Sequence, residues 1–218
     1  MLASLKKKET YTRYFKDFKF AFYCMTHPLD GYWDLTHEKR GSLAVAHSIL
    51  ILTLVARIAS LQFTSFIFNQ VYWPEVNIFL YLGSIVFPLA LWVVGNWALT
   101  TLFDGKAKLP QIYMATCYCM LPYPLFQFPL IIFSNMVTVN EAEFYSVINT
   151  IVLVFCAFSI VLAMSQIHEY TMSKTILFTL FSIFAMLVIV FILLLFFSLI
   201  SQGVAYFISI VREILFRI

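Results

Sequence analysis

Residues 183–197, IFAMLVIVFILLLFF, form an apolar run that contains no polar side chain. A helix of about 20 mainly apolar residues crosses the hydrocarbon core of a membrane and satisfies its backbone hydrogen bonds internally. Only 11% of the chain is charged, against about 25% in soluble domains, which excludes a soluble fold. The sequence therefore predicts an all-α integral membrane protein with five transmembrane helices. The predicted spans are residues 43–66, 78–102, 112–133, 144–164 and 175–203.

Three regions follow from these spans. Residues 1–42 are predicted to form an amphipathic helix and an elbow, residues 43–203 the five-span domain, and residues 204–218 a helical extension. Between Lys6 and Tyr23, aromatic residues recur at helical spacing with basic residues between them. Such a helix is typical of one lying on an anionic membrane surface, and its aromatic face is equally suited to packing on the protein's own spans.

The basic residues predict an orientation. Eight lie in the first 42 residues, and further ones lie in every second connecting segment, at 106, 108 and 174. The positive-inside rule then places the N-terminus in the cytoplasm and, with five spans, the C-terminus outside. Arg212 and Arg217 lie on the predicted outer side and run against this pattern. We expect an integral protein of the plasma membrane.

Polar side chains within the spans are costly in lipid and therefore require partners. Arg57 lies in the first span, Asn96 in the second and Gln127 in the third, between prolines that interrupt the helix. Arg57 can extend its side chain toward the outer interface, or bond to a carbonyl of an earlier turn that a proline leaves without its donor. We expect Arg57, Asn96 and Gln127 to form one intramembrane cluster. Both a helix-packing network and a binding site for a substrate or partner fit this cluster.

The stretch THPLDGYWDLTHEKRGS, residues 26–42, is rich in histidine and acidic residues but lacks the spacing of a metal site. Proline and glycine at 28 and 31 favour a tight turn, so we interpret the stretch as a cytoplasmic docking elbow before the first span. Its candidate residues are His27, Pro28, Asp30, Gly31, Trp33, Asp34, Lys39 and Arg40. The neighbouring cytoplasmic loops contribute Asp104, Lys106, His168, Glu169 and Lys174.

No nucleophile elbow, phosphate-binding loop or zinc-protease motif is present, and six glycines leave little room for nucleotide loops. We therefore expect no enzymatic activity, no catalytic residues, no metal, no cofactor and no nucleic-acid partner.

Several segments carry a family resemblance. They are HPLDGYWDL and EKRGS before the first span, NWALTTLFDGKAK at the end of the second, IYMATCYCMLPYPLFQFPL in the third, EFYSVINTI and IHEYTMSKTI. In these the chain resembles the Yip-type membrane proteins (Ypt/Rab-interacting proteins), in their bacterial branch. The resemblance implies five spans and no catalysis. The Asp-Leu-Tyr-Gly-Pro signature of eukaryotic members is absent, since Thr36 and His37 follow Asp34-Leu35, so GTPase binding is not carried over.

Many bacterial relatives accompany carbohydrate ABC importers, so the resemblance implies importer permease subunits as partners beside the lipid bilayer. The first hypothesis is accordingly a non-catalytic accessory or scaffold subunit of a transport complex. A self-contained small-molecule transporter or channel that uses the broken third span is an alternative. A membrane-shaping or trafficking protein that acts through its N-terminal helix is another.

Overall fold

The computed structural model describes residues 2–68, 72–138 and 141–217. Two short segments lie outside the described residues: 69–71, in the loop between the first and second spans, and 139–140, in the loop between the third and fourth. The described chain contains helices and one 3₁₀ turn but no strand, which confirms the predicted all-α class. The elements are α1 (Leu2–Thr26), α2 (Pro28–His37), α3 (Leu43–Phe63), η1 (Trp73–Glu75), α4 (Ile78–Leu102), α5 (Leu109–Cys119), α6 (Pro122–Ser134), α7 (Ala142–His168) and α8 (Met172–Arg217).

The five predicted spans are confirmed as helices long and apolar enough to cross a membrane. They correspond to α3, α4, α5 with α6, α7, and α8. The third span is interrupted, as its prolines predict, because α5 ends at Cys119 and α6 begins at Pro122.

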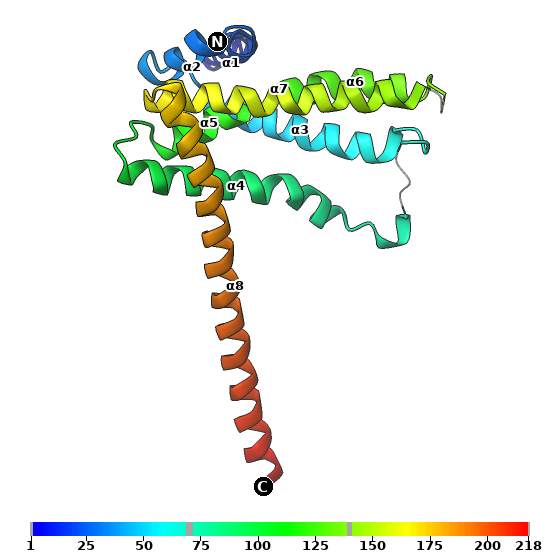
Figure 1. Ribbon diagram of the computed structural model, residues 1–218, viewed down its shortest axis with the longest axis vertical. Helices are drawn as coiled ribbons and strands as arrows, with labels where there is room; N and C mark the ends of the chain where they lie inside the picture. Colours follow the sequence, from blue (N-terminus) through cyan, green and yellow to red (C-terminus); the bar gives the residue numbers. More distant parts are fainter. Residues whose placement is uncertain (1, 69–71, 139–140, 218) are drawn as a thin grey trace.

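Helices α3, α4, α5–α6 and α7 lie side by side and form the body of the molecule (Figure 1). The most buried part of its core lies where α2 packs on α5 and α7 and where α3 packs on α5. Tyr32, Ile49, Ile112, Tyr118 and Ile167 are almost fully buried there. The Cys119 Sγ atom lies 3.0 Å from the Tyr32 hydroxyl, so α2 belongs to the packed body rather than to a loose surface segment.

The aromatic face of α1 packs on the protein's own helices. The Tyr14 hydroxyl donates a hydrogen bond of 2.6 Å to Ser48 of α3, and Phe18 and Phe20 pack against the core. Phe15 points away and is 70% exposed. Of the two alternatives for this helix, contact with the spans therefore accounts for Tyr14 and Phe18, and Phe15 remains available to lipid.

The turn predicted at residues 28–31 is wrong, because these residues form the first turn of α2. Pro28 occupies the start of the helix, where its missing N–H is not needed and its fixed φ suits helix geometry. Gly31 serves close packing instead of a turn: a Cβ atom there would lie 2.7 Å from the Cα atom of Cys24 in α1. His27 separates α1, which ends at Thr26, from α2, which begins at Pro28.

Helix α8 runs crosswise to the other spans and projects out of the body (Figure 1). It is continuous for 46 residues and includes the predicted extension after residue 203. Its N-terminal part packs on α4, where Met186 lies against Gly95: a Cβ atom at Gly95 would be 3.4 Å from Met186 Cγ, in ordinary van der Waals contact. After Ser182, no described side chain of α8 is buried. The helix is thus anchored on α4 as far as Met186 and Ile189, and its C-terminal part projects away from the body.

Candidate functional site

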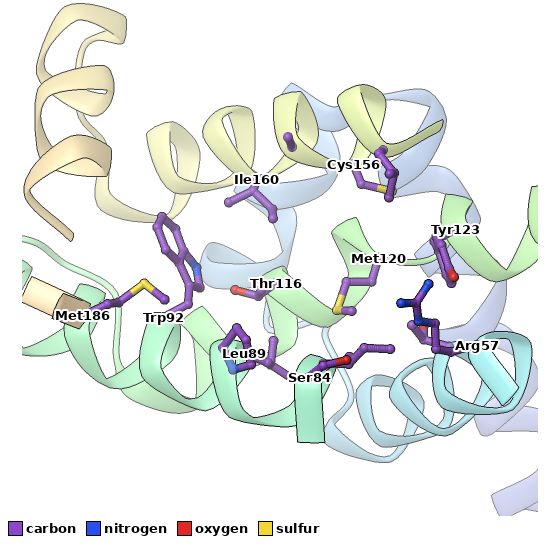
Figure 2. Close-up of a pocket in the computed structure, with 15 residues that line it drawn as sticks. Arg57, Ser84, Leu89, Trp92, Thr116, Met120, Tyr123, Cys156, Ile160 and Met186 are labelled. Atoms are coloured by element: carbon purple, nitrogen blue, oxygen red, sulfur yellow. The ribbon is translucent and has the colours of Figure 1, made fainter. Parts of the chain in front are cut away.

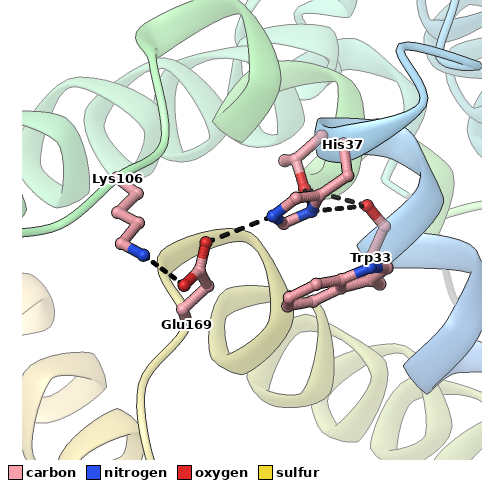
Figure 3. A network of polar contacts seen from close by, with 5 residues as sticks. Trp33, His37, Lys106 and Glu169 are labelled. Carbon is pink, nitrogen blue, oxygen red and sulfur yellow. Dashed lines mark hydrogen bonds and ion pairs between the residues drawn. The ribbon is translucent and has the colours of Figure 1, made fainter.

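Trp33 of the predicted elbow and Lys106 and Glu169 of the predicted loops lie together with His37 at one end of the molecule, and we call these four residues the polar pole (Figure 3). His37 Nε2 lies 3.2 Å from Glu169 Oε1, and Lys106 Nζ donates to Glu169 Oε2. The His37 ring stacks on Trp33 with centroids 3.7 Å apart. One carboxylate therefore joins α2 and the α4–α5 loop to the turn between α7 and α8. His37 lies in the predicted elbow but was not among its candidate residues, and its side chain contacts Glu169.

The polar pole also concentrates unusual backbone. Among the described residues, the non-glycine residues with positive φ are Lys39 (53°), Asp104 (57°) and Glu169 (56°). Left-handed backbone is unfavourable for residues other than glycine and asparagine. At Glu169, which ends α7, the partners of the carboxylate give a reason for glutamate at a position where glycine would be easier.

The remaining elbow residues form exposed contacts. Asp34 and Glu38 flank Arg40, at 3.0 Å and 2.6 Å. Lys39 and Arg40 line a surface groove of about 460 Å³ that continues to Arg13 of α1. His27 stacks on Tyr23 and Asp30 lies in the first turn of α2. This groove gives the predicted docking elbow a predominantly basic face. Within the described ranges, no three His, Cys, Asp or Glu side chains are placed to hold a metal ion.

A pH prediction follows from Glu169. Its hydrogen bond to Lys106, with a further contribution from His37, holds the carboxyl pKa below the ordinary value. The resulting stabilisation is fully present above the ordinary pKa of about 4.3 and is lost as pH falls through the lowered folded-state value. We expect thermal unfolding in detergent to shift to lower temperature in that acidic range, and Glu169→Gln to reduce the shift. The change will be small because the pair is exposed. Equal acid sensitivity of both proteins would contradict the assignment.

Beneath the polar pole lies a buried network. Asn96 Nδ2 donates to Ser182 Oγ at 3.0 Å, and His168 Nε2 lies 3.0 Å from Asn96 Oδ1. All three residues are buried, and they belong to α4, α8 and α7. A Cβ atom at Gly105 would lie 2.9 Å from His168 Nδ1 and 2.6 Å from Thr100 Cβ, so the α4–α5 loop closes tightly over the histidine. The network fixes the base of α8.

The prediction of a single cluster of Arg57, Asn96 and Gln127 is wrong. Arg57 and Gln127 line one cavity of about 310 Å³, together with Tyr81 and Tyr123, whereas Asn96 belongs to the network just described. The reason is depth along the antiparallel helices α3 and α4. Arg57 lies 14 residues after Leu43, where α3 begins near the polar pole, whereas Asn96 lies only six residues before Leu102, where α4 ends near the same pole. At 1.5 Å per residue this separates them by about 12 Å. The two belong to opposite halves of the body.

Gln127 pairs within the third span, where its Nε2 donates to Ser60 Oγ of α3 at 3.0 Å. The partners of Arg57 are tyrosines rather than freed carbonyls: its guanidinium lies 4.6 Å from the centroid of the Tyr81 ring and beside the Tyr123 hydroxyl. Lys174, the last predicted loop residue, lies 4.1 Å from the Tyr170 ring centroid.

Sequence reasoning missed Ser182, Tyr81 and Tyr123 as partners. Ser182 interrupts an apolar helix, and its hydroxyl also donates to Phe178 of the preceding turn. An isolated serine at such a depth is a detectable signal once the depths of facing helices are compared. The tyrosines carried no such signal, because aromatic residues are abundant throughout the chain.

Comparison with known proteins gives one positive result. The family model described as Yip1 domain matches residues 22–210, which includes α2 through most of α8. No curated protein and no solved structure gives a significant match to the chain.

Proposed function

Because the chain belongs to the Yip1 domain family, we propose that it acts as a non-catalytic membrane subunit that binds laterally to another membrane protein. The family assignment agrees with the resemblance noted in the sequence and covers most of the chain. The absence of catalytic motifs in the sequence supports the non-catalytic part of the proposal.

The observation that carries the proposal is α8. Its 46 residues extend about 69 Å at 1.5 Å per residue, roughly twice the thickness of the hydrocarbon core. A helix that lies on a membrane surface has one polar face, whereas residues 183–197 of α8 are apolar on every side. Such a helix is suited to burial among lipids and other apolar helices. Since α8 leaves the body crosswise, it reaches neighbours that the body itself does not touch (Figure 1).

The basic groove lined by Lys39 and Arg40 supplies a second contact surface in this proposal. The proposed orientation places the N-terminus in the cytoplasm. In that orientation the groove of Lys39 and Arg40 faces the cytoplasmic side of the plasma membrane. The permease subunits of a carbohydrate ABC importer are the first partners to test. That choice rests on the resemblance to bacterial members alone.

The test is recovery of partners from cells that express the tagged chain at native level, by gentle detergent extraction and mass spectrometry. Leu187, Phe191 and Leu194 share one face of α8 and are 61–64% exposed. Replacing all three with alanine should reduce partner recovery at least about tenfold, because truncation of several buried interface side chains typically costs more than about 1.4 kcal/mol.

A matched control lies on α7. Val147, Ile151 and Val154 have the same spacing and are 54–61% exposed, so their triple alanine variant removes similar apolar surface elsewhere. This variant should retain the partners. Purification of the unmodified chain alone, or equal loss from both triple variants, would refute lateral binding through α8. Recovery of a stable membrane partner other than an importer permease would support the role as a subunit and refute the assignment to an importer.

A further inference from the structure

Two cavities meet inside the membrane-spanning body. The larger, of about 500 Å³, lies among α3, α4, α5–α6 and α7, with Met186 of α8 at one end, and the smaller, of about 310 Å³, lies between α3, α4, α6 and α7. Arg57, Tyr123 and Leu153 line both, so the two form neighbouring chambers with a shared wall. Their sizes fall within the range of small-molecule sites.

The chambers differ in chemistry. Hydroxyl and amide side chains line the smaller one, including Ser60, Gln127 and Asn149. Leu89, Ile160 and Met186 line the larger one, and Figure 2 shows Arg57 and Tyr123 at one end with Trp92 and Met186 at the other. A polar chamber joined to an apolar chamber fits a molecule with a polar head and an apolar chain.

Arg57 specifies the charge of that head. It is half-buried within a span, and the ion pairs found among the described residues all involve other side chains. Tyr81 and Tyr123 contact the guanidinium but cannot neutralise it. A cation at membrane depth is stabilised by an anion, and guanidinium forms paired hydrogen bonds with phosphate and carboxylate groups.

A second polar atom in the wall lacks a partner. Trp92 Nε1 is buried and makes no hydrogen bond to the described residues, although Trp92 lines the larger chamber. A buried indole N–H normally finds an acceptor. Because the Nε1 atom itself is buried, an acceptor in the larger chamber reaches it only when the indole ring turns toward the chamber.

We propose that the two chambers bind one anionic membrane lipid, with its phosphate or carboxylate at Arg57 and an acyl chain along Leu89, Ile160 and Met186. A free inorganic anion would satisfy Arg57 but leave the apolar chamber without an occupant. The surrounding bilayer supplies amphiphiles to a site at this depth. The inference concerns the interior of the body and holds independently of what α8 binds.

The test uses the full-length chain equilibrated with vesicles of phosphatidylglycerol and phosphatidylcholine in equal amounts, with identical acyl chains. Native mass spectrometry then measures the lipid retained on the protein. We expect phosphatidylglycerol to be retained over phosphatidylcholine by about tenfold, as charge-assisted hydrogen bonds at one arginine allow. Arg57→Gln should bring the ratio close to one, and Arg212→Gln, on the exposed part of α8, should leave it unchanged.

A second variant tests the apolar chamber. Ala157 lines the larger cavity and is exposed on α7, so Ala157→Phe can occupy cavity space without disturbing the buried core. It should reduce retention of both lipids about fivefold or more, in line with loss of an apolar pocket. Equal retention of the two lipids by the unmodified chain, or unchanged preference in Arg57→Gln, would overturn the proposal. If inorganic phosphate stabilised the protein against thermal unfolding as much as phosphatidylglycerol does, the site would bind a free anion and the lipid proposal would be rejected.

Discussion

Replacement of Asn96 by leucine is expected to lower the free energy of unfolding by about 2–3 kcal/mol and to loosen α8 from the body. The variant removes the hydrogen bonds of Asn96 to Ser182 and to His168. Individual hydrogen bonds between membrane helices contribute up to about 1.7 kcal/mol, and a donor left unpaired in the interior adds to the loss.

The histidine makes this position sensitive. His168 Nδ1 is already buried without a hydrogen-bond partner among the described residues, so Asn96 is the remaining polar contact of the ring. Ser182 retains its hydrogen bond to the Phe178 carbonyl and is the less affected partner. The loss is therefore expected to arise mainly at His168, where a polar ring would remain in an apolar surrounding.

Thermal unfolding with a thiol-reactive dye measures this effect, since Cys24, Cys117 and Cys119 are buried and react only when the chain opens. Asn149→Leu is the matched control, because Asn149 also lies in a span but makes no hydrogen bond within the described parts of the chain. In a double-mutant cycle, Asn96→Leu with His168→Leu should cost less than the two single changes together. Additive losses would show that the two side chains do not act as a pair.

The sequence predicted the elements far better than the contacts between them. The spans follow from length and hydrophobicity, which are local properties, and the break at Pro122 follows from the missing proline N–H. The contact between Lys106 and Glu169 could also be expected, because both loops were placed on the same side of the membrane. These features need no knowledge of which helix faces which.

Contacts inside the body required depth and orientation. The cluster of Arg57 with Asn96 failed because residues on antiparallel helices were compared by type and not by distance from the helix end. The helix over residues 28–37 was missed because glycine there was assigned to a turn, although its role is to admit the backbone of α1. The direction of α8 could not be predicted either, since an apolar helix carries no signal for its angle to its neighbours.

The structure separates two tasks along the chain. The network around Asn96 and the crossing at Gly95 hold the base of α8, while the polar pole ties the turn before α8 to α2 and to the α4–α5 loop. The base of α8 is thus connected through these contacts to α2 near the N-terminus. The smaller chamber beside Arg57 lies in the opposite half of the body, whereas the larger chamber extends to Met186 at the crossing of α8 with α4.

Gly31→Val is expected to separate α1 from α2 and to expose the Cys24 thiol. The first side-chain atom at position 31 would lie 2.7 Å from Cys24 Cα and 2.9 Å from its Sγ, and the backbone atom cannot rotate away. Overpacking of this kind costs about 1–3 kcal/mol, so α1 should move off the body rather than accept the overlap.

The reactivity of Cys24 reports this movement. Burial, with a contribution from the charge of Asp34, raises the pKa of the Cys24 thiol from 9.0 to about 12. A return to the ordinary pKa increases the thiolate fraction at neutral pH about a thousandfold. We therefore expect labelling by a maleimide at pH 7.5 to accelerate at least about a hundredfold in Gly31→Val, measured by peptide mass spectrometry in a Cys156→Ala background.

Gly83→Val supplies the control, because a Cβ atom at this helical glycine meets nothing within 4 Å. It carries the same helix-propensity cost without the overlap, so its Cys24 should stay as slow to react as in the parent chain. Cys117 and Cys119, which are buried in α5, distinguish local from global opening within the same sample. Faster labelling at Cys24 alone indicates that α1 detaches while the rest of the body stays folded. Slow labelling of Cys24 in Gly31→Val would contradict the prediction, because it would show that α1 and α2 accommodate the larger side chain without separating.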